Sequence, residues 1–201
     1  MPQPGRVPVK ELLGNIRAHS DVDNAIHKPI LYRLSSNDEV EQLRSLLSSS
    51  DRLEVIDTYY DQLVELQKCL NPQLKTPEEC DLAIQNYLNG QSIEEVGTWV
   101  YYPWNSRLIK VLPEAEFIQV RTNRNKYKIS PEEQSLLQQK RIGLIGLSVG
   151  KEVAMTLAME RSFGELRLAD FDTLELSNLN RIRTGLHTLG KLKAVTVARE
   201  I

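Results

Sequence analysis

Residues 141–201 alternate between apolar runs and amphipathic segments, and this alternation constrains the fold more than any other feature of the sequence. RIGLIGL, from residue 141, and ELRLAD, from residue 165, predict two strands. SVGKEVAMTLAMER between them predicts a helix, and GKLKAVTVAREI after them predicts the start of another. Since strand, helix and strand follow within about 30 residues, the sequence predicts a βαβ unit with a parallel sheet and a right-handed crossover.

The region before this unit reads as a mostly helical α+β region. Residues 1–35 are an irregular lead-in with one short strand at Ile30–Arg33. Residues 36–129 form the second predicted unit, and apolar side chains at steps of three or four predict helices over 36–49 and 53–70. A capping box at Thr76 predicts a helix that ends at Asn89–Gly90, and a second box at 92–95 predicts a short helix.

Three runs rich in β-forming residues follow, TWVYYPW, SRLIKVL and AEFIQVRT, with turn residues between them. They predict a small antiparallel sheet. Polar residues 122–129 form a connector, and the third predicted unit is 130–201. It begins with a capping box in which Ser130 is the cap, Pro131 takes the first helical position and Glu133 reaches back, so the helix should end near Gln139.

Composition excludes several classes of function. The formal net charge is −2, which gives no basic field for nucleic acid. No window approaches 18 uncharged apolar residues, and the N-terminus lacks the apolar core of a signal peptide. Cys69 and Cys80 form no CxxC pair, so we expect reduced thiols in a cytoplasmic protein. The three histidines, His19, His27 and His187, form no ligand cluster, and no metal site is expected.

The loop Gly146-Leu-Ser148-Val-Gly150 lies where the first strand turns into a helix. Dinucleotide-binding folds place glycines there so that the backbone and the helix N-terminus can approach phosphate. This loop departs from GxGxxG, so a tight turn without a ligand remains an alternative. Asp170 ends the second strand and is placed to accept hydrogen bonds from ribose, although a turn aspartate would also fit. Both features suit an NAD(P)- or FAD-dependent oxidoreductase as well as any other nucleotide-binding protein.

A polar set follows that an oxidoreductase does not need. Arg181 and Lys193 are the residue types that meet developing phosphate charge, the arginine as a fork and the lysine as a point charge. Asn178 offers a neutral donor and acceptor for ribose or phosphate, and Asp172 can hold a metal-bound nucleotide or orient the arginine. Lys191 fits better as a surface lysine of the first helical turn.

These residues resemble the ThiF/MoeB/HesA-type adenylyltransferases, the bacterial relatives of ubiquitin-activating enzymes. The family hallmark runs D-x-D, S-N-L-x-R-Q and G-x-x-K. Asp170 and Asp172 match its first part, Ser177-Asn178-Leu179 and Arg181 match the second, and Gly190 and Lys193 match the third. Ile182 replaces the usual glutamine, and GLSVG replaces a glycine-richer loop. WVYYPW, RTNRNKYKIS and GLSVG are similar to a bacterial subset, some members of which are fused to a nitroreductase-like domain.

The resemblance implies a Rossmann-like domain that uses ATP and Mg²⁺ to convert a carboxylate into an acyl-adenylate. A small ubiquitin-like or sulfur-carrier protein often supplies that carboxylate. By analogy, Gly146, Ser148 and Gly150 would form the phosphate loop, and Asp170 would bind ribose. Asn178 and Lys193 would hold phosphates. Arg181 would stabilise charge, frequently across a homodimer interface, with Asp172 beside the nucleotide.

The family also implies several strands beyond the helix of Lys193, including an acidic residue for Mg²⁺. The sequence stops at Ile201, inside that helix, so we expect a fragment or truncated form that is inactive alone. Three hypotheses remain open: the N-terminal part of an adenylyltransferase, an oxidoreductase, and a non-catalytic ThiF-like interaction module.

Overall fold

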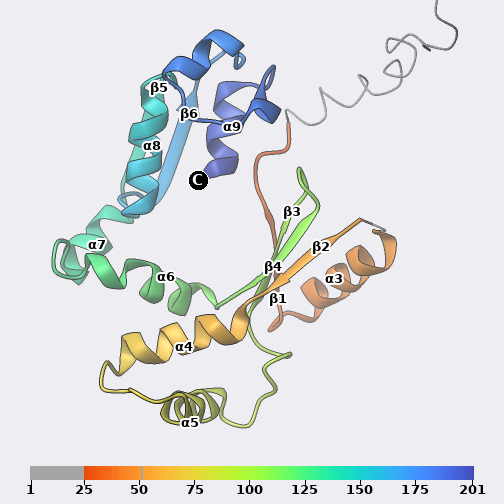
Figure 1. The fold of residues 1–201 in the computed structure, drawn as a ribbon, viewed down its shortest axis with the longest axis vertical. Coiled ribbons are helices and arrows are strands. Elements are labelled where there is room, and N and C mark those ends of the chain that lie inside the picture. Colours follow the sequence, from red (N-terminus) through yellow and green to blue (C-terminus); the bar gives the residue numbers. More distant parts are fainter. Residues whose placement is uncertain (1–24, 51) are drawn as a thin grey trace, which may run out of the picture.

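The computed structural model of the protein describes residues 25–50 and 52–201. These residues form a mixed α/β fold with two separate sheets, of four and of two strands (Figure 1). Most of the predicted lead-in, including His19, lies outside the described residues. Within its described part, the predicted strand at Ile30–Arg33 is confirmed as β1.

The larger sheet has the order β1-β3-β4-β2. Its further strands are β2 (Glu54–Asp57), β3 (Thr98–Tyr102) and β4 (Arg107–Val111). β3 pairs antiparallel with both β1 and β4. The pairing of β3 with β4 confirms the antiparallel sheet predicted for the runs TWVYYPW and SRLIKVL. β2 pairs parallel with β4, so the sheet is mixed.

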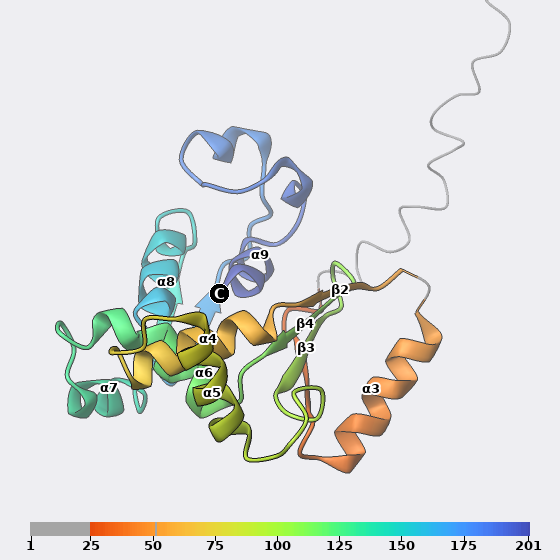
Figure 2. The same cartoon turned by 60° about the horizontal axis from the view of Figure 1, so that its bottom comes forward.

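Two groups of helices accompany this sheet. α3 (Asn37–Ser49), capped by Ser36, packs Leu43 against Tyr32 and Leu108. The second group comprises α4 (Tyr59–Leu70), α5 (Pro77–Leu88) and α6 (Glu114–Thr122), which Figure 2 shows gathered together. Their core is built from Tyr59, Leu63, Leu66, Ile84 and Leu112. The capping box at Thr76 and the end of α5 at Asn89 are confirmed.

The predicted helix over 53–70 is wrong in its first part, where β2 forms instead. Val55 and Ile56 are β-branched and favour a strand, and they gain a parallel ladder with Leu108 and Ile109 of β4. The helix starts only at Tyr59, whose backbone N–H donates to the Asp57 carboxylate at 3.0 Å. Pairing within the sheet therefore overrides the helical spacing of the apolar residues.

Two further predictions are wrong. AEFIQVRT is not a strand but most of α6, which has Glu114 and Glu116 in its first turn and Arg121 in its last, an order that favours a helix. Residues 92–95 form turns rather than a helix. The Ser92 hydroxyl oxygen accepts a hydrogen bond from the backbone N–H of Glu94 at 3.4 Å. This bond stabilises a local turn and does not cap a helix.

The predicted βαβ unit is confirmed. After α7 (Pro131–Leu137), capped by Ser130 with Glu133 reaching back, the chain forms β5 (Arg141–Ile145), α8 (Gly150–Met159), β6 (Glu165–Ala169) and α9 (Lys193–Glu200). β5 and β6 are parallel neighbours. α8 and α9 pack on this sheet through a core of Leu147, Ala154 and Val197.

The two regions touch through side chains far apart in the sequence. The Arg199 guanidinium of α9 donates to the backbone oxygen of Ile26 at 2.6 and 2.8 Å and lies 5.2 Å from the Trp104 ring centroid. Arg121 of α6 donates to the Ala158 oxygen at 3.1 Å. In residues 25–50 and 52–201, Cys69 and Cys80 are free thiols, and no helix is long and apolar enough to cross a membrane.

Candidate functional site

A pocket of about 770 Å³ lies at the carboxyl ends of β5 and β6. We call it the strand-end pocket. Four of the residues predicted from the sequence line it: Gly146, Ser148, Asp170 and Asp172. Open α/β sheets bind ligands at this edge, because loops and helix N-termini converge there. The pocket is therefore the candidate functional site.

The loop between β5 and α8 is held by its backbone and by one buried side chain. Gly146 has φ +83°, a left-handed conformation that favours glycine, and its N–H donates to the Ala169 oxygen at 2.8 Å. Leu147 is 1% exposed and anchors the loop in the core. Gly150 begins α8, whose first N–H groups lack partners within the helix. The loop thus presents backbone donors beside the pocket.

Asp170, which follows the end of β6, holds this loop through its carboxylate. One carboxylate oxygen accepts the Leu147 N–H at 2.7 Å, and the other accepts the Asp172 N–H at 2.9 Å. Partial burial alone would raise the pKa of Asp170, but these two hydrogen bonds and the nearby Lys193 ammonium lower its pKa overall. Asp170 is therefore held ionised, with oxygens facing both the loop and the pocket.

Asp172 joins the pocket to the start of α9. Its carboxylate forms an ion pair of 2.8 Å with the Lys193 ammonium, and its backbone oxygen accepts the Lys193 N–H at 3.0 Å. Lys193 is buried, whereas about half of the Asp172 side chain is exposed. Lys193 therefore does not line the pocket itself, and its ammonium is connected to the pocket through the Asp172 carboxylate.

Asn178 and Arg181 do not line the strand-end pocket. They belong to the segment 174–190, which projects beyond the sheet in both views (Figures 1 and 2). Asn178 is buried in the 3-10 helix Leu176–Asn180, where its side-chain oxygen accepts the Glu175 N–H at 3.2 Å. The exposed Arg181 donates to the Asn180 side chain at 2.9 Å. The structure thus brings together the loop, Asp170, Asp172 and Lys193, but not these two residues.

Sequence reasoning missed the apolar rim of the pocket. Ile145, Val149 and Phe171 line it and are 90, 78 and 94% exposed. Large apolar side chains this exposed beside a polar pocket suit the planar face of a heterocycle. The signal was present in the sequence, since each of the three adjoins a residue already singled out.

Lys151 was also missed as a structural residue. It is 3% exposed on the first turn of α8, and its ammonium forms a 2.6 Å ion pair with Glu200 at the end of α9. The same ammonium donates to the backbone oxygen of Arg183. Lys151 therefore ties α8, α9 and the segment that follows Arg181 to one another. A lysine at a helix N-terminus opposes the helix dipole, which was the available signal.

No group of three or more His, Cys, Asp or Glu side chains within residues 25–50 and 52–201 is placed to hold a metal ion. Asp170 is occupied by two backbone donors and Asp172 by Lys193. The described residues therefore do not fit a Mg²⁺ ion held by protein side chains alone.

Comparison with known proteins finds one family that the C-terminal part matches. Residues 121–201 match the ThiF family. The match begins nine residues before residue 130, where the sequence predicts the start of the third unit. A protein of Mycobacterium tuberculosis described only as uncharacterized is 40% identical over 155 residues. The match covers 77% of this chain and 20% of that relative, so the chain spans about one fifth of the relative's length. No solved structure matches.

Proposed function

We propose that the protein contributes the nucleotide site of an ATP-dependent adenylyltransferase, a proposal that the match of residues 121–201 to the ThiF family supports. Such an enzyme activates a carboxylate as an acyl-adenylate. The observation that carries the proposal is the pocket lined by Gly146, Ser148, Asp170 and Asp172, in which Asp170 accepts hydrogen bonds of 2.7 and 2.9 Å from the backbone of the loop and of Asp172. Lys193 does not line the pocket itself but forms a 2.8 Å ion pair with Asp172.

In the proposed reaction, a carboxylate oxygen attacks the α-phosphorus of ATP. The bond between that phosphorus and the α,β-bridging oxygen breaks, and pyrophosphate leaves with the bond's electron pair. Negative charge builds on the phosphoryl oxygens, so fixed donors and cations around them lower the barrier. ATP is accompanied by Mg²⁺ as its counter-ion.

Each residue of the strand-end pocket has a proposed part. The loop at Gly146, Ser148 and Gly150 offers backbone N–H groups to phosphate. Asp170, ionised and fixed against the loop, accepts from the ribose hydroxyls. Lys193 leaves Asp172 for a phosphate oxygen, and the freed Asp172 carboxylate remains beside the nucleotide. The exposed rings and branched chains of Phe171, Ile145 and Val149 cover the base.

Arg181 is proposed to act on a neighbouring copy. It is exposed and does not line the strand-end pocket of its own chain, which supports delivery across a homodimer interface rather than within one chain. Asn178 caps the short helix just before Arg181, so we assign it the positioning of that segment. The carboxylate partner proposed for the complete protein is the C-terminus of a small ubiquitin-like or sulfur-carrier protein.

Isothermal titration of the purified chain with ATP·Mg²⁺ and, in parallel, with NADH tests the proposal. We expect ATP·Mg²⁺ to bind and NADH to give no heat. Asp170→Ala should weaken ATP binding by about tenfold or more, since it removes charge-assisted hydrogen bonds of about 1.5–3 kcal/mol. Arg181→Ala should leave the affinity of a monomer unchanged.

Glu65→Gln is the matched control, because it removes an exposed carboxylate of α4 remote from β5 and β6. It should bind ATP as the unaltered chain does. A preference for NADH would overturn the proposal in favour of an oxidoreductase. Binding of neither nucleotide by a folded chain would favour a non-catalytic module.

A further inference from the structure

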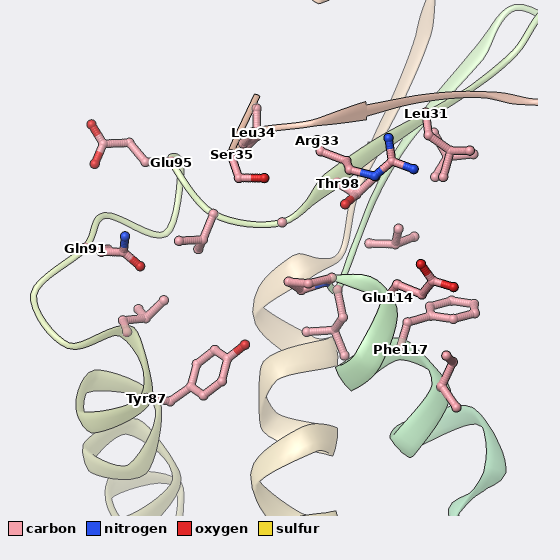
Figure 3. A pocket seen from close by; sticks show the side chains of 18 of the residues that line it. Leu31, Arg33, Leu34, Ser35, Tyr87, Gln91, Glu95, Thr98, Glu114 and Phe117 are labelled. Atoms are coloured by element: carbon pink, nitrogen blue, oxygen red, sulfur yellow. The ribbon is translucent and has the colours of Figure 1, made fainter. Parts of the chain in front are cut away.

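A second cavity lies apart from the strand-end pocket. It has a volume of about 940 Å³ and lies between the larger sheet, α5 and α6 (Figure 3). Arg161, which follows the end of α8, also lines it. We call it the sheet cavity. Its size falls within the range of sites that bind small molecules.

The walls of the sheet cavity are largely apolar. Leu31 of β1 pairs in register with Val100 of β3, so both side chains point to the same face of the sheet, and both line the cavity. Figure 3 shows Phe117 of α6 facing Leu31 across the space, and Tyr87 reaching toward it from α5. Leu31 is 46% exposed and Phe117 37%, so apolar surface remains for a ligand to cover.

Arg161 supplies the cavity with a positive charge. Partial burial lowers the pKa of its guanidinium, Glu114 opposes this effect, and Arg121 adds to it. Within the described chain no carboxylate lies within 4.0 Å of the Arg161 guanidinium, so its cost of burial is not offset by an ion pair. Its backbone also holds φ +53°, an uncommon conformation for arginine.

The other charged side chains of the cavity do not compete for this role. Arg33 is paired with Glu39 at 2.7 Å and is thereby neutralised. Glu114 and Glu95 also line the cavity, and of these two only Glu114 contributes to the pKa of Arg161. Figure 3 shows Glu95 at the other side of the cavity from Glu114 and Phe117. Of the two arginines that line the cavity, Arg161 is the one that forms no ion pair within the described residues, so an anionic group fits beside it with an apolar body toward Leu31 and Phe117.

We propose that the sheet cavity binds a small amphipathic monocarboxylate, with its carboxylate on Arg161 and its apolar chain between the sheet and α6. A guanidinium pairs with a planar carboxylate through two parallel hydrogen bonds. This site is separate from the proposed nucleotide site: Gly150 at the start of α8 adjoins the phosphate loop, and Arg161 follows its end. Ten residues of helix place them roughly 15 Å apart, too far for this carboxylate to reach the α-phosphorus.

Titration of the purified chain with octanoate, without nucleotide, tests the proposal, and 1-octanol serves as the uncharged comparison. We expect octanoate to bind at one site and about 10- to 100-fold more tightly than 1-octanol, the effect of one charged hydrogen-bonding group. Arg161→Asn should remove that preference, and asparagine tolerates the left-handed backbone. Leu31→Trp, on an edge strand, should fill the apolar part and abolish binding of both ligands.

Two control variants separate this site from others. Arg44→Gln removes an exposed arginine of α3 that does not line the cavity, and Asp170→Ala impairs the proposed nucleotide site, so both should bind octanoate normally. The proposal is overturned if octanoate does not bind, if 1-octanol binds equally well, or if Arg161→Asn and Leu31→Trp both keep the original affinity. Loss of octanoate binding in Asp170→Ala would also overturn it. None of these results depends on ATP binding.

Discussion

The buried ion pair between Lys151 and Glu200 predicts a large effect for a single conservative substitution. Lys151→Met keeps the apolar stem of the side chain but removes its ammonium. The ammonium contacts both Glu200 oxygens, at 2.6 and 2.8 Å, and the Arg183 backbone oxygen. Breaking a fully buried pair costs about 3–5 kcal/mol. The Glu200 side chain is 33% exposed and can regain water, so we expect a loss of about 2 kcal/mol in the free energy of unfolding.

Urea denaturation at pH 7, followed by circular dichroism, measures this loss. In thermal unfolding, a loss of about 2 kcal/mol corresponds to a fall in Tm of roughly 4–8 °C for a chain of this length. Arg44→Met is the matched control, because Arg44 forms a 2.9 Å pair with Glu41 in which both side chains are about 70% exposed. That pair should contribute less than about 0.5 kcal/mol.

A double-mutant cycle with Glu200→Gln isolates the pair from its surroundings. Since the two side chains are in contact, the coupling free energy should be about 1 kcal/mol or more. High salt should leave it nearly unchanged, because a buried pair is screened far less than a surface pair. If Lys151→Met is no more destabilising than Arg44→Met, or if the coupling is zero, the reasoning about this pair is refuted.

Two further predictions concern the fold around the two sites. Gly97→Ala should lower the free energy of unfolding by about 2 kcal/mol, because Gly97 has φ +103° and a Cβ there would lie 2.8 Å from the buried Tyr59 ring. Gly143→Ala, where nothing lies within 4 Å, should cost little in the same urea assay, and equal effects would contradict the argument. For Asp170, the folded-state pKa is lowered, so its contribution to stability is present above its unfolded pKa of about 3.9 and is lost as pH falls through the folded value. Urea midpoints between pH 6 and pH 3 should therefore fall less for Asp170→Asn than for the unaltered chain, and parallel curves would count against a lowered pKa.

The sequence predicted those elements whose signals are local. The capping boxes at Thr76 and Ser130 fix the starts of α5 and α7 through bonds within four residues, and both formed as expected. The strands and helices of 141–201 were predictable because their apolar periodicity agrees with the packing they adopt. At these places local preference and tertiary structure coincide.

The errors arose where a distant partner decides the conformation. Val55 and Ile56 share a helical spacing with the residues after them, and only the ladder with β4, about 50 residues later, makes them a strand. Phe117 and Val120 favour a strand by residue type, but acidic residues at the start and Arg121 at the end of the segment favour the helix that forms. The same limit applies to the site. Asp170 and Lys193 were found from their chain positions, but the ion pair of Lys193 with Asp172 and the buried state of Lys151 depend on how α8 and α9 pack.

α8 connects the two sites that we propose. Its first turn holds Lys151, which fixes the backbone of Arg183 just after Arg181, and Arg161 beyond its last turn lines the sheet cavity. Gln134 of α7 donates to the Arg161 backbone oxygen at 2.8 Å, so the carboxyl end of α8 is also tied to the preceding helix. A ligand that contacts Arg161 therefore contacts the end of a short helix whose other end adjoins the phosphate loop. If binding of this ligand changes the affinity for ATP, ATP must change the affinity for the ligand by the same factor. Titrating octanoate with and without saturating ATP measures that factor, and a factor of one would mean that the two sites are independent.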